Sequence, residues 1–391
     1  ERASATSALK WLFFSPYLTR VHTVELLEIE RLHVAINNHV RDGGRGLLSV
    51  SNHASTFDDP GLMCAGVLPA EAFYTPRKMR WNFCAEKVCF SKGALLAAFF
   101  GAGKALPISR KGGLQQPVLK TTARMLASGH HVHIYPEGRV WQERAHARDE
   151  HGRWSTANGK RFGKPLAKLG PLHRGVGNLF ASAVDAKLGE ARRVTAEAEA
   201  EAARGPQPQS RSATRSATPA PLDTAQLPMI LPFFHVGMDN ILPIEADGRP
   251  AKGLNALRAR AKGEPPVVVK VGSEIAVSDL VRMYEVAVGA ATTRRDGAAA
   301  GAAAAADAGA TAARLALVDG VVARIEVALL ELEGEVRSLA RERGTEASYG
   351  IPQKSTRADW DAAQARYAAL FAGREQRARA REQAQASTQQ E

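Results

Sequence analysis

The sequence predicts an α/β fold, with a mixed, mostly parallel sheet flanked by helices, disordered insertions and a C-terminal helix. Short apolar runs bounded by glycine or proline recur along the chain, and stretches with helical periodicity separate them. This alternation is typical of parallel strands, because each crossover between two of them needs a long connection, usually a helix. Polar, reactive side chains follow several apolar runs, which favours a site at the carboxyl ends of the strands.

The expected elements follow in chain order. Short apolar runs predict strands, and apolar residues three and four apart predict helices. Strands are expected at residues 46–50, 104–108, 130–135, 227–243 and 266–272. Helices are expected at residues 24–38, 60–67, 115–127, 171–184 and 314–339.

Several stretches break this pattern. Residues 143–170 are polar and rich in glycine and basic side chains, as expected of a surface insertion. Residues 187–226 carry alanine with glutamate and then proline, glutamine and serine, so they lack a hydrophobic period and are expected to be disordered. An alanine-rich spacer at residues 286–313 and a charged tail at residues 344–391 complete the chain.

The formal net charge of +12 suggests an anionic partner: nucleic acid, a membrane surface or a phosphate-bearing substrate. Much of the excess lies in arginine-rich and alanine-rich stretches outside the expected core, so solvated tails are the alternative explanation. No recognised nucleic-acid-binding motif accompanies the charge, and nucleic acid is therefore not expected as a partner.

The cysteine and histidine patterns give no sign of a metal. Cys64, Cys84 and Cys89 are odd in number and form no Cys-x2-Cys pair, which argues against a disulfide framework or a zinc ribbon. His131 and His133 are expected on one side of a strand, but no third ligand follows at a suitable spacing. Neither a metal nor another cofactor is expected.

Membrane contact is expected at an interface, not across a bilayer. No apolar run reaches the roughly 18 residues that a spanning helix requires. Residues 8–18 and 93–103 have the composition of interfacial segments, and burial in the core is the alternative for each. Between them, Arg77, Lys78 and Trp81 belong to a basic, aromatic cluster suited to lipid headgroups or to an ordinary solvated face.

A histidine and an aspartate lie five positions apart directly after the first strand. His53 leaves the end of the run at residues 46–50, and Asp58 comes just before Asp59 and Pro60, which favour the start of a helix. On a continuous helix the two side chains would point apart, so they meet only if the backbone bends between them. An imidazole held by a carboxylate is a candidate general base; a structural histidine is the alternative.

Two further polar groups follow later strands. Arg110 comes after the strand at residues 104–108, and Glu137, Gly138 and Arg139 come after the strand at residues 130–135. Because carboxyl ends of parallel strands share one edge of a sheet, these groups are expected on the same rim as His53.

Together these residues resemble the four-block pattern of the glycerolipid acyltransferases. The blocks are NHASTFDDP at 52–60, PISR at 107–110, YPEGR at 135–139 and ILP at 230–232. Further segments, including RGVGNL at 174–179 and LPFFHVGMDNILP at 231–243, resemble more narrowly the phospholipid–lysophospholipid transacylases that remodel cardiolipin. The resemblance covers about residues 10–285, and the insertions and the long tail depart from it.

The resemblance implies roles for individual residues. His53 would be the catalytic base and Asp58 would orient it, while Ser55 would only make local turn hydrogen bonds. Substrate binding would fall to a set of residues around them: Asn52, Arg110, Glu137, Gly138, Arg139 and His235. The two arginines would bind phosphate, for which a guanidinium fork is suited.

With the resemblance, the chain is expected to divide into five parts. They are an N-terminal interfacial or helical region at 1–45, an acyltransferase domain at 46–285, the spacer at 286–313, a C-terminal helix at 314–343 and the tail at 344–391. The insertions and the C-terminal helix are candidate contacts for a protein complex.

Three functions stay open on the sequence. The first is CoA-independent acyl transfer on cardiolipin and monolysocardiolipin by a peripheral or monotopic protein of a mitochondrial membrane, facing the intermembrane space; a plastid membrane is the alternative location. The second is a CoA-dependent glycerol-3-phosphate or lysophosphatidate acyltransferase. The third is a catalytically silent lipid-binding protein of the same fold.

Overall fold

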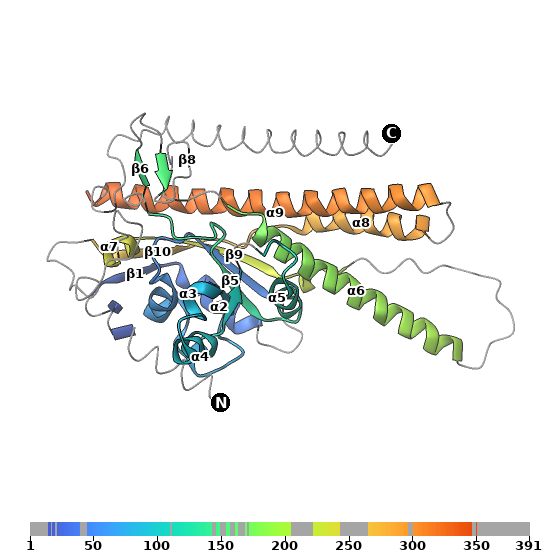
Figure 1. The fold of residues 1–391 in the computed structure, drawn as a ribbon, viewed down its shortest axis with the longest axis horizontal. Helices are drawn as coiled ribbons and strands as arrows, with labels where there is room; N and C mark the ends of the chain where they lie inside the picture. Colours follow the sequence, from blue (N-terminus) through green and yellow to red (C-terminus); the bar gives the residue numbers. More distant parts are fainter. Residues whose placement is uncertain are drawn as a thin grey trace.

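A computed structural model describes most of the chain (Figure 1). The described residues are 15–16, 18–19, 22–39, 45–109, 112–142, 146–148, 154–156, 161–162, 169, 172–204, 222–242, 265–295, 300–345 and 349. No helix among them is long and apolar enough to cross a membrane.

A five-stranded sheet forms the centre of the fold. Its strands lie in the order β1 (Val24–Leu27), β10 (Val267–Val271), β9 (Met229–Val236), β2 (Leu47–Ser51) and β5 (His131–Ile134). Only the β9–β10 pair is antiparallel. Every residue of β2 is buried, as both faces of the sheet are covered by helices. The predicted α/β fold with a mostly parallel mixed sheet is confirmed.

Two smaller sheets accompany it. β3 (Asn82–Ala85) pairs in parallel with β4 (Ala105–Ile108), and a bridge between Trp81 and Val132 joins this pair to β5. The predicted strand at residues 104–108 therefore exists but lies outside the central sheet. An antiparallel sheet of β6 (His146–Arg148), β7 (Trp154–Thr156) and β8 (Arg161–Phe162) lies within the predicted surface insertion.

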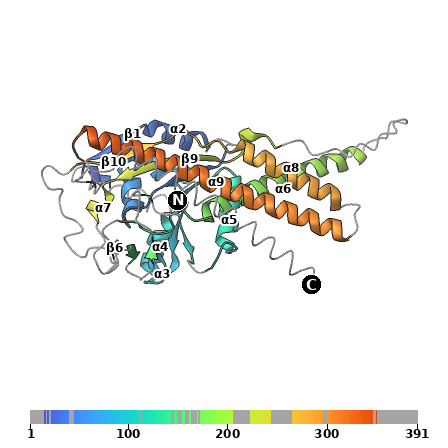
Figure 2. The ribbon, with the colours of Figure 1, turned by 90° about the horizontal axis from the view of Figure 1, so that it is seen from above.

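Helices surround the sheets. The longer ones are α2 (Ile29–His39), α4 (Ala94–Ala102), α5 (Pro117–Ala127), α6 (Gly175–Arg204), α8 (Ser278–Arg295) and α9 (Ala300–Glu342). Short or irregular turns are η2 (Asp58–Val67), η3 (Ala70–Phe73), α3 (Glu86–Cys89), η5 (Thr224–Gln226) and α7 (Met238–Ile241). α9 runs over the sheet, α8 lies beside the part of α9 that extends past the sheet, and α6 also extends beyond it (Figures 1 and 2).

The sheet separates two apolar cores. Neighbouring residues of one strand point to opposite faces, so Phe234 joins the core beneath α5, α6 and α9 while Phe233 joins the core beneath α2 and η2. Phe180 and Ile325 fill the first core, and Ile36 fills the second. A strand buried on both faces explains why residues 229–236 are almost continuously apolar.

The first predicted helix is only partly right. Residues 24–27 form the edge strand β1, paired in parallel with β10, and the helix begins at Ile29 after a positive φ of 55° at Glu28. Pairing with a strand more than two hundred positions away outweighed the local helical period. The candidate interfacial segment at residues 8–18 lies largely outside the described residues.

The alanine-rich stretches are helical, which contradicts part of the predicted disorder and shows that most of the predicted spacer is helix. α6 continues to Arg204, through the start of the stretch 187–226, whose residues 205–221 lie outside the described part. α8 and α9 cover most of residues 286–313. Alanine and glutamate are strong helix formers, so a missing hydrophobic period removes packing but not helical propensity. The predicted C-terminal helix therefore begins at Ala300, while the tail is described only at its start and at Tyr349.

The odd cysteine count does not predict the disulfide that is present. Cys84 and Cys89 are bonded between β3 and α3, with their Cα atoms 6.1 Å apart, and Cys64 is buried in a core.

Two buried histidines of β5 are held by a serine of β2. Ser49 Oγ lies 2.8 Å from His131 Nε2 and 3.0 Å from His133 Nδ1. Burial lowers the pKa of His133 well below its ordinary value, and the nearby charge of Arg80 acts in the same direction. Among the described residues, no group of three or more histidine, cysteine, aspartate or glutamate side chains is placed to hold a metal ion.

Substitution of two glycines in α6 tests how closely α6 packs on α9. A Cβ at Gly177 would lie 2.4 Å from the Val318 carbonyl oxygen, whereas a Cβ at Gly189 would meet nothing within 4 Å. Gly177→Ala should lower the free energy of unfolding by about 1–3 kcal/mol. Gly189→Ala should raise it by up to about 1 kcal/mol, since alanine favours a helix. Urea unfolding of both variants measures the difference, and equal effects would contradict the close contact.

Burial of His133 predicts a pH dependence of stability. A histidine whose pKa is lowered in the folded state binds a proton more readily in the unfolded state. The free energy of unfolding is therefore highest above pH 6.5, about the pKa of an unfolded histidine, and decreases as the pH falls below that value. In urea unfolding between pH 7.5 and 5.5, His133→Asn should show a shallower loss below pH 6.5. The slopes should differ by up to about 1.4 kcal/mol per pH unit, the value for one proton. Identical slopes would show that His133 takes no part.

Candidate active site

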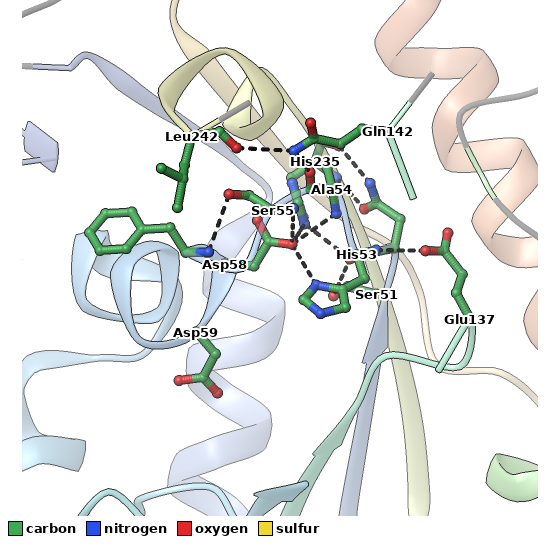
Figure 3. Close-up of polar contacts among 12 residues, drawn as sticks. Ser51, His53, Ala54, Ser55, Asp58, Asp59, Glu137, Gln142, His235 and Leu242 are labelled. Atoms are coloured by element: carbon green, nitrogen blue, oxygen red, sulfur yellow. Dashed lines mark hydrogen bonds and ion pairs between the residues drawn. The ribbon is translucent and has the colours of Figure 1, made fainter. Parts of the chain in front are cut away.

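The chain turns sharply between the end of β2 and the start of η2. This bend brings His53 Nδ1 to 2.9 Å from Asp58 Oδ2, as Figure 3 shows. The Asp58 side chain is fully buried, whereas the His53 side chain keeps 19% of its surface exposed. The predicted meeting of the two side chains is therefore observed, with the carboxylate inside and the imidazole at the surface.

One oxygen of Asp58 collects several donors. Besides His53, the backbone N–H groups of Ala54 and Ser55 donate to Oδ2, at 2.8 and 2.9 Å. Because both amides must donate, Oδ2 is the acceptor of each contact, and Nδ1 of His53 carries the proton that faces it. The other ring nitrogen, Nε2, is then left to accept a proton.

A second histidine lies behind the carboxylate. His235 Nε2 is 3.6 Å from Asp58 Oδ2 and 3.0 Å from the Asn52 carbonyl oxygen. The Asn52 side chain accepts from the His235 backbone N–H and donates to its carbonyl, both at 2.9 Å. Burial lowers the pKa of His235, although the Asp58 charge opposes the shift.

This clamp revises two predicted substrate contacts. His235 is fully buried and Asn52 is 2% exposed, so neither side chain is open to a lipid. β9 pairs directly with β2, which brings His235 against the turn that carries His53. Asn52 therefore joins the turn to β9, and His235 lies against Asp58.

The loop after β5 holds the backbone of the candidate base. Glu137 Oε2 accepts from the His53 N–H at 3.1 Å, and the Trp141 N–H donates to the His53 carbonyl at 2.7 Å. Glu137 is 1% exposed, which favours holding the loop over the predicted contact with a substrate. Gly138 has a φ of 66°, and a Cβ there would lie 3.0 Å from the His173 ring, so glycine is required.

An aromatic ring that motif reasoning missed covers one face of the imidazole. Tyr135 stacks on His53 with ring centroids 4.1 Å apart and an angle of 17° between the planes. Burial raises the pKa of Tyr135 well above its usual value, so this phenol stays neutral near His53. Tyr135 directly follows β5, the parallel neighbour of β2, and this position in the sequence could have predicted its place beside His53.

Asp59 has a different role from the predicted helix cap. Its backbone is extended within η2, at φ −129° and ψ 115°, and η2 already begins at Asp58. Its carboxylate pairs with the buried Arg80, whose Nε lies 3.1 Å away, and also accepts from Asn82. Arg80 in turn donates to the Gly103 carbonyl at 3.1 Å. Asp59 therefore ties the histidine turn to β3 and to the end of α4.

Of the two arginines predicted to bind phosphate, Arg139 lies in the described part of the chain. Arg139 is half-buried, and its guanidinium lies 5.6 Å from the ring centroid of Trp141, the residue bonded to the His53 carbonyl. Arg110 lies outside the described residues, so its contribution stays a prediction.

The arrangement suits proton abstraction by an oriented imidazole. Ser55 is fully buried and accepts the Phe57 N–H at 3.2 Å, so it serves the turn, as predicted. An attacking hydroxyl would then come from a substrate, with no acylated side chain in between.

Comparison with known proteins agrees with the motifs. Residues 30–188 match the sequence model of the acyltransferase family. Tafazzin of Drosophila melanogaster is 40% identical over 100 residues, which are 26% of this chain and 26% of that protein. An N-acylphosphatidylethanolamine synthase of Arabidopsis thaliana is 36% identical over 120 residues, 30% of this chain and 40% of that protein. Taffazin of Dictyostelium discoideum is 35% identical over 99 residues, 25% and 34% of the two chains.

The matched segments contain most of the site but not all of it. The chain spans about a quarter to two fifths of the length of these curated relatives. His53, Asp58 and the loop at Glu137 lie inside the family match, whereas His235 lies beyond it. Residues 30–188 thus match the acyltransferase family, and the chain is similar to the tafazzins.

Proposed function

We propose that this protein transfers acyl groups between phospholipids and lysophospholipids without CoA. The observation that carries the proposal is the contact of His53 Nδ1 with Asp58 Oδ2, an oxygen already fixed by two backbone N–H groups. That geometry holds the imidazole in one orientation and one tautomer, which a general base requires.

The reaction follows from the free ring nitrogen. His53 Nε2 takes the proton of the free hydroxyl of a lysophospholipid while that oxygen attacks an ester carbonyl of a second phospholipid. The tetrahedral intermediate collapses with loss of the glycerol oxygen of the donor, and His53 returns the proton to that oxygen. The donor becomes a lysophospholipid and the acceptor becomes a full phospholipid, so no cofactor is consumed.

Cardiolipin and monolysocardiolipin are the proposed substrate pair. Two phosphates on one lipid suit a chain with a net charge of +12 and arginines at positions 110 and 139. Similarity to tafazzins supports a mitochondrial membrane. We place the protein on the side of the intermembrane space, with a plastid membrane as the alternative location. Association would be peripheral or monotopic, and the insertions or the C-terminal helix would contact any protein partner.

A second candidate reaction is N-acylation of phosphatidylethanolamine. The Arabidopsis thaliana relative named for this product is 36% identical over 120 residues, a similarity comparable to that of the tafazzins. The acceptor would be an amine instead of a hydroxyl, and the same imidazole would take its proton. The lipid product distinguishes the two reactions.

Loss of the base tests the proposal directly. Purified protein is mixed, without CoA, with vesicles that hold acyl-labelled phosphatidylcholine and either monolysocardiolipin or phosphatidylethanolamine. Label should move into cardiolipin, and His53→Ala should slow this transfer by about 10²–10⁴-fold. His130 directly precedes β5, at the end of the strand away from His53. His130→Ala is the matched control and should leave the transfer rate unchanged.

The other outcomes of this assay point to different functions. Label in N-acylphosphatidylethanolamine alone would favour the second reaction. Transfer only after addition of an acyl-CoA would move the protein to the CoA-dependent acyltransferases. Lipid binding without any transfer would support a catalytically silent protein.

Removal of Arg139 tests the phosphate role. Arg139→Ala should raise the apparent KM for the lysophospholipid more than it lowers kcat, because a contact with the phosphate is present before the chemical step. Arg282→Ala, an exposed arginine of α8, serves as the control and should change neither constant. A fall in kcat at unchanged KM would instead show that Arg139 contacts the substrate only in the transition state.

A further inference from the structure

The helix α4 has no polar face. Its nine residues, ALLAAFFGA, contain no charged or hydrogen-bonding side chain, and none of the nine is buried. Leu95 keeps 87% of its surface exposed, and the preceding Val88 keeps 48%. Single exposed apolar residues are normal, but a surface helix that is apolar all round is not, because water then faces the whole helix.

α4 lies on the side of the molecule away from the α8–α9 pair (Figure 1). Its neighbours in the described chain are the short elements β4 and α3. Phe99 and Phe100 contact each other edge to face at 5.4 Å, and Phe90 lies 6.5 Å from Phe100. These aromatic side chains gather at the surface instead of entering either core.

Positive charge borders this apolar surface. Lys87 and Lys92 flank the turn into α4, and both are exposed. Glu86 is the one exposed acidic residue between β3 and α4. Lysines beside the exposed Leu95 and partly exposed phenylalanines match an anionic lipid surface, where headgroups attract the charge and acyl chains accept the apolar side chains.

The length of α4 fixes how it would meet a bilayer. Nine residues of helix extend roughly 13 Å, less than half of the ~30 Å hydrocarbon thickness. The helix therefore fits the boundary between headgroups and acyl chains and does not cross it.

The same helix is connected to the candidate base. Gly103, at the C-terminal end of α4, accepts from Arg80, and Arg80 is paired with Asp59. Asp59 directly follows Asp58, the residue that orients His53. A membrane bound at α4 would thus be connected through Arg80 and Asp59 to the turn that carries His53.

We propose that α4, together with Val88, Lys87 and Lys92, is the surface that docks this protein on an anionic phospholipid membrane. We call this set the docking patch. The proposal rests on the proposed function, since it specifies how an enzyme acting on two lipids reaches them. Leu95, Leu96 and Phe99 enter the acyl boundary, and the two lysines contact the headgroups.

Vesicle sedimentation tests the apolar part of the patch. Leu95→Ser/Phe99→Ser should weaken binding to phosphatidylcholine vesicles containing phosphatidylglycerol by about tenfold or more, given the transfer energy of a leucine and a phenylalanine. Met283→Ser/Val286→Ser is the matched control on α8, where the two side chains are 70% and 72% exposed. The control should bind like the unchanged protein.

The lysines and a reporter give independent measurements. Lys87→Gln/Lys92→Gln should weaken binding to the anionic vesicles several-fold, and binding to pure phosphatidylcholine should not change. Leu95→Trp keeps an apolar side chain at an exposed position; its fluorescence should shift to the blue on binding and be quenched by bromine-labelled acyl chains. This variant also covers the case in which the serine variant unfolds.

The outcomes separate docking from catalysis. Short-chain lipids dispersed as monomers should be transacylated equally by the unchanged protein and the serine variant, because no docking is needed. Absence of transfer with any lipid, together with binding that depends on α4, would overturn the proposed function and leave the docking patch standing. Equal binding by the α4 and α8 variants, no vesicle binding at all, or an unshifted Leu95→Trp emission would overturn the patch.

Discussion

A single carboxylate oxygen organises the candidate site. Asp58 Oδ2 accepts from His53 and from two backbone N–H groups, and it can do so only because the chain bends between His53 and Asp58. In a buried setting these charge-assisted contacts are strong, and leaving any of the donors unpaired would be costly. The apolar cores on both faces of the sheet keep water away from this oxygen and thereby keep the turn in one conformation.

The local parts of this arrangement could be predicted from the sequence. The spacing of His53 and Asp58, with Asp59 and Pro60 after them, indicates a bend because a continuous helix would separate the two side chains. Most strands are also recognisable, since buried runs such as residues 229–236 are apolar throughout. These features depend on neighbours within a few positions.

The parts that could not be predicted depend on pairing between distant segments. His235 lies behind Asp58 only because β9 pairs with β2, and Tyr135 covers His53 only because β5 pairs on the other side of β2. Asp59 pairs with Arg80 by the same kind of long-range contact. The alanine-rich helices were missed for the opposite reason. Their helical propensity is a local property of alanine and glutamate, whereas the prediction relied on hydrophobic periodicity, which detects only helices with an apolar packing face.

The clamp between Asn52 and His235 also sets an order of events during synthesis. The two residues are separated by 183 positions, so at a translation rate of about 5–20 residues per second His235 is made roughly ten to forty seconds after Asn52. Throughout that interval β2 lacks its neighbour β9, and β10 is synthesised later still. A nascent chain of this protein therefore carries His53 and Asp58 long before β9 brings His235 against Asp58.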